Sequence, residues 1–126
     1  MESLPGGEGK PMAEALRQGL GGSAKIELVP DAAMGNLVPR VGCALVGIDT
    51  FDDTGAILDK VGTLPLALCC RHFGKPFYAA GHQLKRSDRA LDDSSEPGSS
   101  SHTRLFDCTP AELITRPVTT EGTCER

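Results

Sequence analysis

The chain has 126 residues, a net charge of −4 and no Trp, which leaves room for one domain, over 1–126, with an aliphatic core. The acidic balance and the shortage of aromatic side chains argue against direct binding of nucleic acid, which needs cations for phosphates and rings for stacking. The apolar runs at 41–48 and 64–70 are far shorter than a membrane span, and the glycine-rich N-terminus does not resemble a secretory signal, so we expect a cytoplasmic protein without a membrane segment.

The first forty residues predict two helices and a strand. Residues 10–20 have apolar side chains at helical spacing, and Gly21 can end that helix. Residues 24–29 alternate strictly between apolar and polar, which predicts a strand. Asp31 is placed to cap a short helix over 32–38 by accepting a bond from a free backbone N–H.

The middle of the chain predicts a strand, a helix and a second strand. Residues 41–48 form a continuous apolar run, typical of a strand buried on both faces of a parallel sheet. After a polar loop at 49–55, a helix fits 62–73, with a proline in its first turn. Residues 76–80 are another short apolar strand. The alternation of helices and strands predicts an α/β fold with a parallel sheet and covering helices.

The last third of the chain contains a polar segment and one more helix–strand pair. Residues 86–104 are rich in Ser, Asp and Arg without apolar periodicity, so we expect a mobile insertion there. Thr109 and the three residues after it have the pattern of a capped helix start. Residues 114–120 predict a final strand.

The cysteines and histidines do not predict a metal or a disulfide framework. There are five cysteines, an odd number, and no spacing fits a zinc site. Cys43, Cys69 and Cys70 lie in apolar runs and are expected to be small buried side chains. No dinucleotide fingerprint is present, so we expect no cofactor.

Two segments have residues suited to chemistry, and each has a simpler interpretation. Asp49 follows a buried strand, at the edge where open α/β sheets bind ligands, and it could transfer protons or simply cap a loop. Lys60, Gly62 and Thr63 precede a helix, where an ammonium, free N–H groups and a hydroxyl would suit a phosphate. The residues alone favour the simpler interpretation in both cases, a loop cap and an ordinary helix start.

An ordered set of short motifs resembles the translation initiation factor 2B alpha/beta/delta subunit family, which includes methylthioribose-1-phosphate isomerase and ribose-1,5-bisphosphate isomerase. The motifs occur in the family's order and cover most of the chain outside 86–104. They are Glu2-Ser3-Leu4-Pro5, Glu8-Gly9, Pro30-Asp31-Ala32-Ala33-Met34-Gly35, Gly47-Ile48-Asp49, Asp59-Lys60-Val61-Gly62-Thr63, Lys75-Pro76-Phe77-Tyr78 and Phe106-Asp107-Cys108-Thr109-Pro110.

The resemblance implies a Rossmann-like C-terminal lobe and roles for individual residues. Asp49 matches the proton-transfer acid of the isomerases, and Lys60 matches a lysine that contacts the phosphorylated sugar. The remaining residues of the implied substrate or phosphate site are Glu8, Gly62, Thr63 and Lys85. A sugar phosphate or a nucleotide phosphate is the implied ligand. Family lobes of this kind pair through their C-terminal domains, so a second copy or a related subunit is the implied partner.

The chain also departs from the family pattern. None of its five cysteines matches the reactive cysteine of the isomerases, and the fold is expected to be incomplete at the N-terminus, without the family's helical domain and opening strand. Asp59 replaces an Asn beside the phosphate lysine, and Leu4 replaces an Arg. We therefore expect a non-catalytic, initiation-factor-2B-like regulatory or assembly lobe, with a remnant of a sugar-phosphate aldose–ketose isomerase as the alternative.

Overall fold

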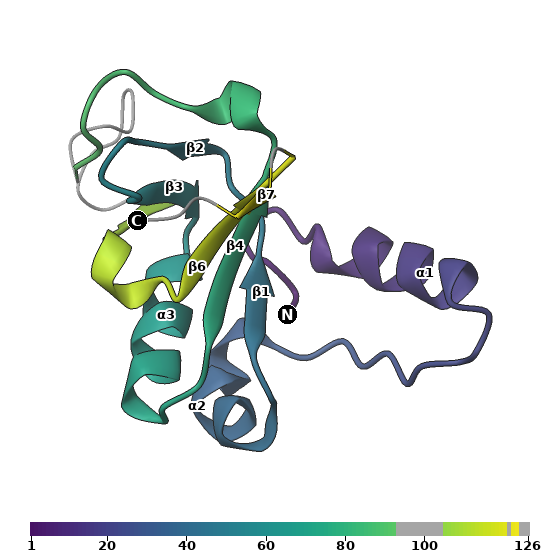
Figure 1. Cartoon of the computed structure of the whole chain (residues 1–126). Helices are drawn as coiled ribbons and strands as arrows, with labels where there is room; N and C mark the ends of the chain where they lie inside the picture. The colour runs from purple at the N-terminus through teal and green to yellow at the C-terminus, as the bar shows by residue number, and fades with distance from the viewer. Residues whose placement is uncertain (93–104, 121, 124–126) are drawn as a thin grey trace.

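The structure is a computed structural model that describes residues 1–92, 105–120 and 122–123. Two β-sheets share a core with the helix α3, Thr63–His72 (Figure 1). The helices are α1 (Gly9–Gly19), α2 (Met34–Leu37) and α3 (Thr63–His72), with 3-10 turns η1 (Asp31–Ala33), η2 (Val38–Arg40), η3 (Gln83–Lys85) and η4 (Ala111–Leu113). The strands are β1 (Ala44–Val46), β2 (Thr50–Phe51), β3 (Ile57–Lys60), β4 (Phe77–Gly81), β5 (Phe106–Thr109), β6 (Arg116–Thr119) and β7 (Gly122–Thr123).

The larger sheet confirms the predicted α/β class. Its strand order is β1-β4-β6-β7, and β4 pairs in parallel with both β1 and β6. The helix α3 packs on one face of this sheet, where Phe77 and Ala79 of β4 and Ala67 and Cys70 of α3 are almost fully buried. The strands predicted at 76–80 and 114–120 are therefore present as β4 and β6.

The boundaries of α3 follow the residues predicted for them. Gly62 precedes the helix at φ +105°, a backbone conformation that L side chains rarely adopt. Gly74 follows it at φ +62°, and the N–H of Lys75 donates to the carbonyl of Cys70 at 2.8 Å to close the last turn. The helix predicted over 62–73 is thus confirmed.

The second sheet was not predicted. It is antiparallel, in the order β2-β3-β5, and the fully buried Ile57 of β3 pairs with Thr109. No element was predicted where β3 lies, because a four-residue segment containing Asp and Lys gives no clear periodicity. Its partner β5 is far along the chain, so no local signal marks the pair. The helix predicted to start at 109 is only the 3-10 turn η4, and Thr109 ends β5 without capping it.

The buried carboxylate of Asp52 holds the turn between β2 and β3. It accepts hydrogen bonds from the N–H groups of Thr54 (2.9 Å), Ala56 (3.1 Å) and Leu91 (2.7 Å) and from the Thr54 hydroxyl. Burial alone would raise the pKa of Asp52, but these hydrogen bonds outweigh it and hold the pKa below its ordinary value. The polar loop predicted at 49–55 is therefore an ordered β2 strand and turn.

Three expectations for the first half of the chain are wrong in this structure. Residues 24–29 form no strand, although they alternate. The strand predicted at 41–48 is only β1, an edge strand whose Leu45 is 67% exposed, so it is not buried on both faces. Cys43 is exposed rather than buried.

Asp31 stabilises a different segment from the one predicted. The short helix at 32–38 is present as α2 between two 3-10 turns, and no side chain caps it. The Asp31 carboxylate instead accepts the N–H groups of Ser3 at 3.0 Å and Leu4 at 2.7 Å. It thereby fastens the N-terminal segment to the body of the domain.

The predicted mobile insertion at 86–104 lies largely outside the described residues, which stop at 92 and resume at 105. Its described part contacts the turn after β2, since the Arg86 guanidinium donates to Asp53 at 2.7 Å. In the part of the chain that the structure covers, no helix has the length and apolar character needed to cross a bilayer.

Candidate functional site

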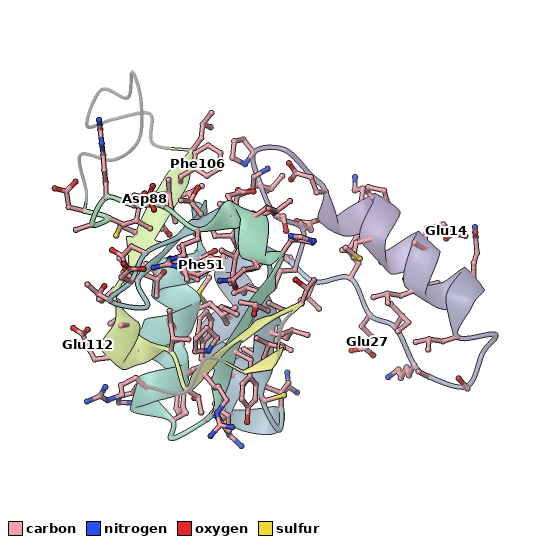
Figure 2. All side chains as sticks on the ribbon, turned by 45° about the horizontal axis from the view of Figure 1, so that its top comes forward. Glu14, Glu27, Phe51, Asp88, Phe106 and Glu112 are labelled. Atoms are coloured by element: carbon pink, nitrogen blue, oxygen red, sulfur yellow. The ribbon has the colours of Figure 1, made fainter. Side chains whose placement is uncertain are left out.

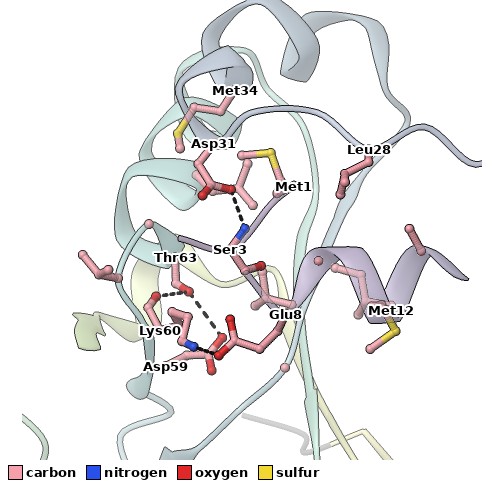
Figure 3. Close-up of a pocket in the computed structure, with 18 of the residues that line it drawn as sticks. Met1, Ser3, Glu8, Met12, Leu28, Asp31, Met34, Asp59, Lys60 and Thr63 are labelled. Atoms are coloured by element: carbon pink, nitrogen blue, oxygen red, sulfur yellow. Dashed lines mark hydrogen bonds and ion pairs between the residues drawn. The ribbon is translucent and has the colours of Figure 1, made fainter. Parts of the chain in front are cut away.

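The candidate site lies where β1 and β3 end and α1 and α3 begin. A cavity of about 370 Å³ opens there (Figure 3). Much of its lining is apolar, including Met12, Leu16 and Leu45, whereas Glu8, Asp59 and Lys60 make one side charged. An edge at the carboxyl ends of parallel strands is the usual place for a ligand in an α/β fold.

Lys60 is engaged by an acid from the N-terminal segment. Its ammonium forms an ion pair with the carboxylate of Glu8, the residue immediately before α1 (Figure 3). The Lys60 side chain is 28% exposed, and the hydrogen bond from it lowers the pKa of Glu8. The lysine that the resemblance assigns to a phosphate therefore already has an anionic partner within the chain.

Asp107 occupies the N-terminus of α3. One of its carboxylate oxygens accepts the N–H of Gly62 at 2.7 Å and the N–H of Leu64 at 3.2 Å. The Thr63 hydroxyl lies 2.7 Å from the Lys60 carbonyl and 3.3 Å from a carboxylate oxygen of Asp59. The N–H of Gly62, which the resemblance assigns to a phosphate site, thus binds a carboxylate of the same chain, and this negative charge is favourable next to the helix dipole.

Sequence reasoning missed the part that Asp107 plays. Asp107 was noted only within a motif that resembles the family, and nothing near it in sequence indicates a helix cap. Its position follows from the pairing of β3 with β5, in which Asp59 is directly opposite Asp107. Only a prediction of that non-local strand pair could have found the contact.

Asp49 and Asp59 form a pair of neighbouring carboxyl groups. Burial is the main cause that raises the pKa of Asp59, and the adjacent Asp49 carboxyl raises it further. The backbone N–H of Asp49 donates to the Leu58 carbonyl at 3.1 Å, which fixes the chain beside β3. A carboxyl group with a raised pKa can exchange protons at milder pH than an ordinary one.

Lys85 lies beside Asp49, the member of this pair that does not line the cavity. Its ammonium donates to the Ile48 carbonyl at 2.5 Å and lies 3.9 Å from a carboxylate oxygen of Asp49. Neither Lys85 nor Asp49 lines the cavity, whereas Glu8, Lys60, Gly62 and Thr63 do. The six predicted site residues therefore fall into two groups, separated by Asp59.

Acids of the same chain outnumber the lysines at the site. Four acids, Glu8, Asp49, Asp59 and Asp107, surround the two lysines and the N-terminus of α3. Among the described residues, no group of three or more His, Cys, Asp or Glu side chains is placed to hold a metal ion. No cysteine lines the cavity in this part of the chain.

Comparison with known proteins gives related sequences of two kinds. A model of the initiation factor 2 subunit family matches residues 1–101. The "putative translation initiation factor eIF-2B subunit 2-like" of Pyrococcus furiosus is 32% identical over 96% of this chain and 46% of its own length. The ribose 1,5-bisphosphate isomerase of Archaeoglobus fulgidus is 31% identical over 71% of this chain and 28% of its own length.

A solved structure has the same fold. The translation initiation factor eIF-2B of Pyrococcus horikoshii OT3 superposes with a TM-score of 0.79 and 29% identity, over 97% of this chain and 46% of that one. The chain therefore spans less than half the length of these relatives.

Proposed function

Because the chain belongs to the initiation factor 2 subunit family, we propose that it is a non-catalytic assembly lobe of the initiation-factor-2B type. In this proposal its partner is a related subunit or a second copy of the chain. The observation that carries the proposal is that acids of the same chain engage the groups a phosphate would need. Glu8 pairs with Lys60, and Asp107 binds the N-terminus of α3.

The energetic reason is that a phosphate must compete with these acids. To bind at Lys60 it must displace Glu8, and to bind at Gly62 it must enter next to the negative charge of Asp107. Asp59 adds a further carboxyl beside Thr63. Repulsion between the phosphate and these carboxylates disfavours binding. An exposed ion pair between the phosphate and Lys60 would contribute only about 0–1 kcal/mol to binding.

Exposed apolar side chains support the assembly role. Leu68 of α3 and Phe73, the residue directly after it, are 51% and 39% exposed. Large apolar side chains that are exposed on a surface can take part in protein–protein contacts.

Sedimentation equilibrium tests the assembly role. We expect a mass above that of the 13.2 kDa chain, either for the chain alone or after mixing with a related subunit of the family. A mass that remains at 13.2 kDa across micromolar concentrations, with and without that subunit, would contradict it.

A remnant of a sugar-phosphate isomerase is the second candidate. The 31% identity to a ribose 1,5-bisphosphate isomerase favours it, as does the position of Asp49, Lys60 and Thr63 at one end of the sheets. Its ligand would be a sugar phosphate or a nucleotide phosphate. Turnover of ribose 1,5-bisphosphate or methylthioribose 1-phosphate above a blank, lost in Asp49→Asn, would establish this candidate in place of the first.

A further inference from the structure

We propose that α1 is a hinged lid that closes over the cavity and packs its apolar side on the open face of the larger sheet. The term "open face" denotes the side of β1, β4 and β6 that carries Leu45, Tyr78 and Val118. This inference concerns the fold's own motion and does not rest on the proposed function.

The open face lacks a cover among the described residues. In the register of the sheet, Leu45 is opposite Tyr78, and Ala80 is opposite Val118, so these side chains share one side. Leu45 is 67% exposed and Val118 is 37% exposed, whereas Phe77 and Ala79 on the other side are buried under α3. Parallel strands are normally covered on both faces, so this arrangement calls for a second layer.

The helix α1 also has an apolar side that is exposed, as the open face is. Met12 is 61% exposed, Leu16 is 43% exposed, and Leu20 at the end of the helix is 42% exposed. Figure 2 shows α1, which carries Glu14, beside the return segment that carries Glu27, both standing away from the sheets. Of the residues in α1, only Ala13 is buried.

An isolated helix of this length is marginal in water. α1 has 11 residues, two of them Gly, and its first turn contains no acid to offset the helix dipole. Helices shorter than about 12–15 residues rarely persist without tertiary packing. Packing against the open face would supply the contacts that α1 lacks.

The apolar side of α1 and the β1 edge of the open face already border the same cavity. Met12 and Leu16 line it from α1, and Leu45 lines it from β1. The base of α1 is fixed, because Glu8 pairs with Lys60 and Asp31 binds the N–H groups of Ser3 and Leu4. A rotation about this base therefore moves the tip of α1 and brings its apolar side toward Leu45.

Amide hydrogen exchange of the full chain tests the closure. If the lid closes, amides of 13–19 exchange at least about tenfold more slowly than in an unfolded chain, because α1 is packed for most of the time. Leu45→Ser, which changes a side chain that is exposed in the open arrangement, should abolish this protection. Leu84→Ser is the matched control, since Leu84 is 88% exposed on η3, and it should leave the protection unchanged.

Protection of the Tyr78 amide in β4 shows that the sheet remains folded in both variants. Absence of protection in α1 of the wild-type chain, or protection that survives Leu45→Ser, would overturn the proposal. Protection of α1 that disappears on tenfold dilution would also overturn it, because the open face would then be covered by a second copy.

Discussion

Asp59 carries a charge that its surroundings disfavour. Burial and the neighbouring Asp49 carboxyl raise its pKa, so the ionised form costs stability in the folded state. We expect Asp59→Asn to increase the free energy of unfolding at pH 7 by on the order of 1 kcal/mol. Urea unfolding of the two proteins at a series of pH values measures this difference.

The pH dependence has a defined sign. Because the folded pKa of Asp59 lies above the ordinary value of 3.8, the wild-type chain loses stability relative to Asp59→Asn as pH rises through the folded pKa. The part of the difference that comes from the charge should vanish well below pH 3.8, where Asp59 is neutral in both states. Asp88→Asn, an exposed acid in the loop after η3, is the control and should change little. A loss of stability in Asp59→Asn at pH 7 would show that the charge is favourable.

The resemblance to the family, and not the residue types alone, assigned residues to the site, and no sequence pattern indicated their partners within the chain. Thr63 begins α3, as the sequence predicts, whereas Lys60 ends β3, a strand that was not predicted. The two acids that engage this region, Glu8 and Asp107, are more than forty residues from their partners along the chain. Contacts of that range depend on the packing of α1 and β5, which no local pattern specifies.

At the scale of elements, β4 passes so close to the segment after β1 that Gly81 leaves no room for a side chain. A Cβ at Gly81 would lie 2.9 Å from the Cβ of Ile48, which is 2% exposed and has no room to move. We expect Gly81→Ala to cost about 1–3 kcal/mol through overpacking. Gly47→Ala is the matched control, because its Cβ would meet nothing within 4 Å.

Thermal unfolding of the two alanine variants makes the comparison. A melting temperature for Gly81→Ala equal to that of Gly47→Ala would mean that Ile48 yields, and that the end of β1 is not held by β4. Such a result would also mean that this contact does not fix the position of Asp49, which directly follows Ile48.

The elements that the sequence predicted well are those whose signals are local. α3 has a helical length and glycines at both ends, and β4 is a short apolar run between breakers. β3 has neither signal and forms because β5 pairs with it. Residues 24–29 have a strand pattern but no neighbouring strand in the structure. Alternation of apolar and polar residues therefore indicates that a segment can pair as a strand. Whether it does so depends on a neighbouring strand elsewhere in the fold.

For the molecule as a whole, we propose that its own acids occupy the places that a phosphate would take. Glu8 on Lys60 and Asp107 on α3 leave the N-terminal end of α3 electrostatically satisfied. This occupation explains how a chain with isomerase relatives can act, in our proposal, as an assembly lobe.

Titration with inorganic phosphate, followed through the amide shifts of Gly62 and Leu64, tests this claim most directly, with NaCl at matched ionic strength as the control. The wild-type chain should bind no more tightly than about 1 mM, or roughly 4 kcal/mol. Asp107→Ala, which frees both N–H groups, should bind more tightly and show larger shifts at these two amides. Saturation of the wild-type shifts well below 1 mM, abolished by Lys60→Ala, would contradict the account, because the site would then be open to phosphate despite its acids.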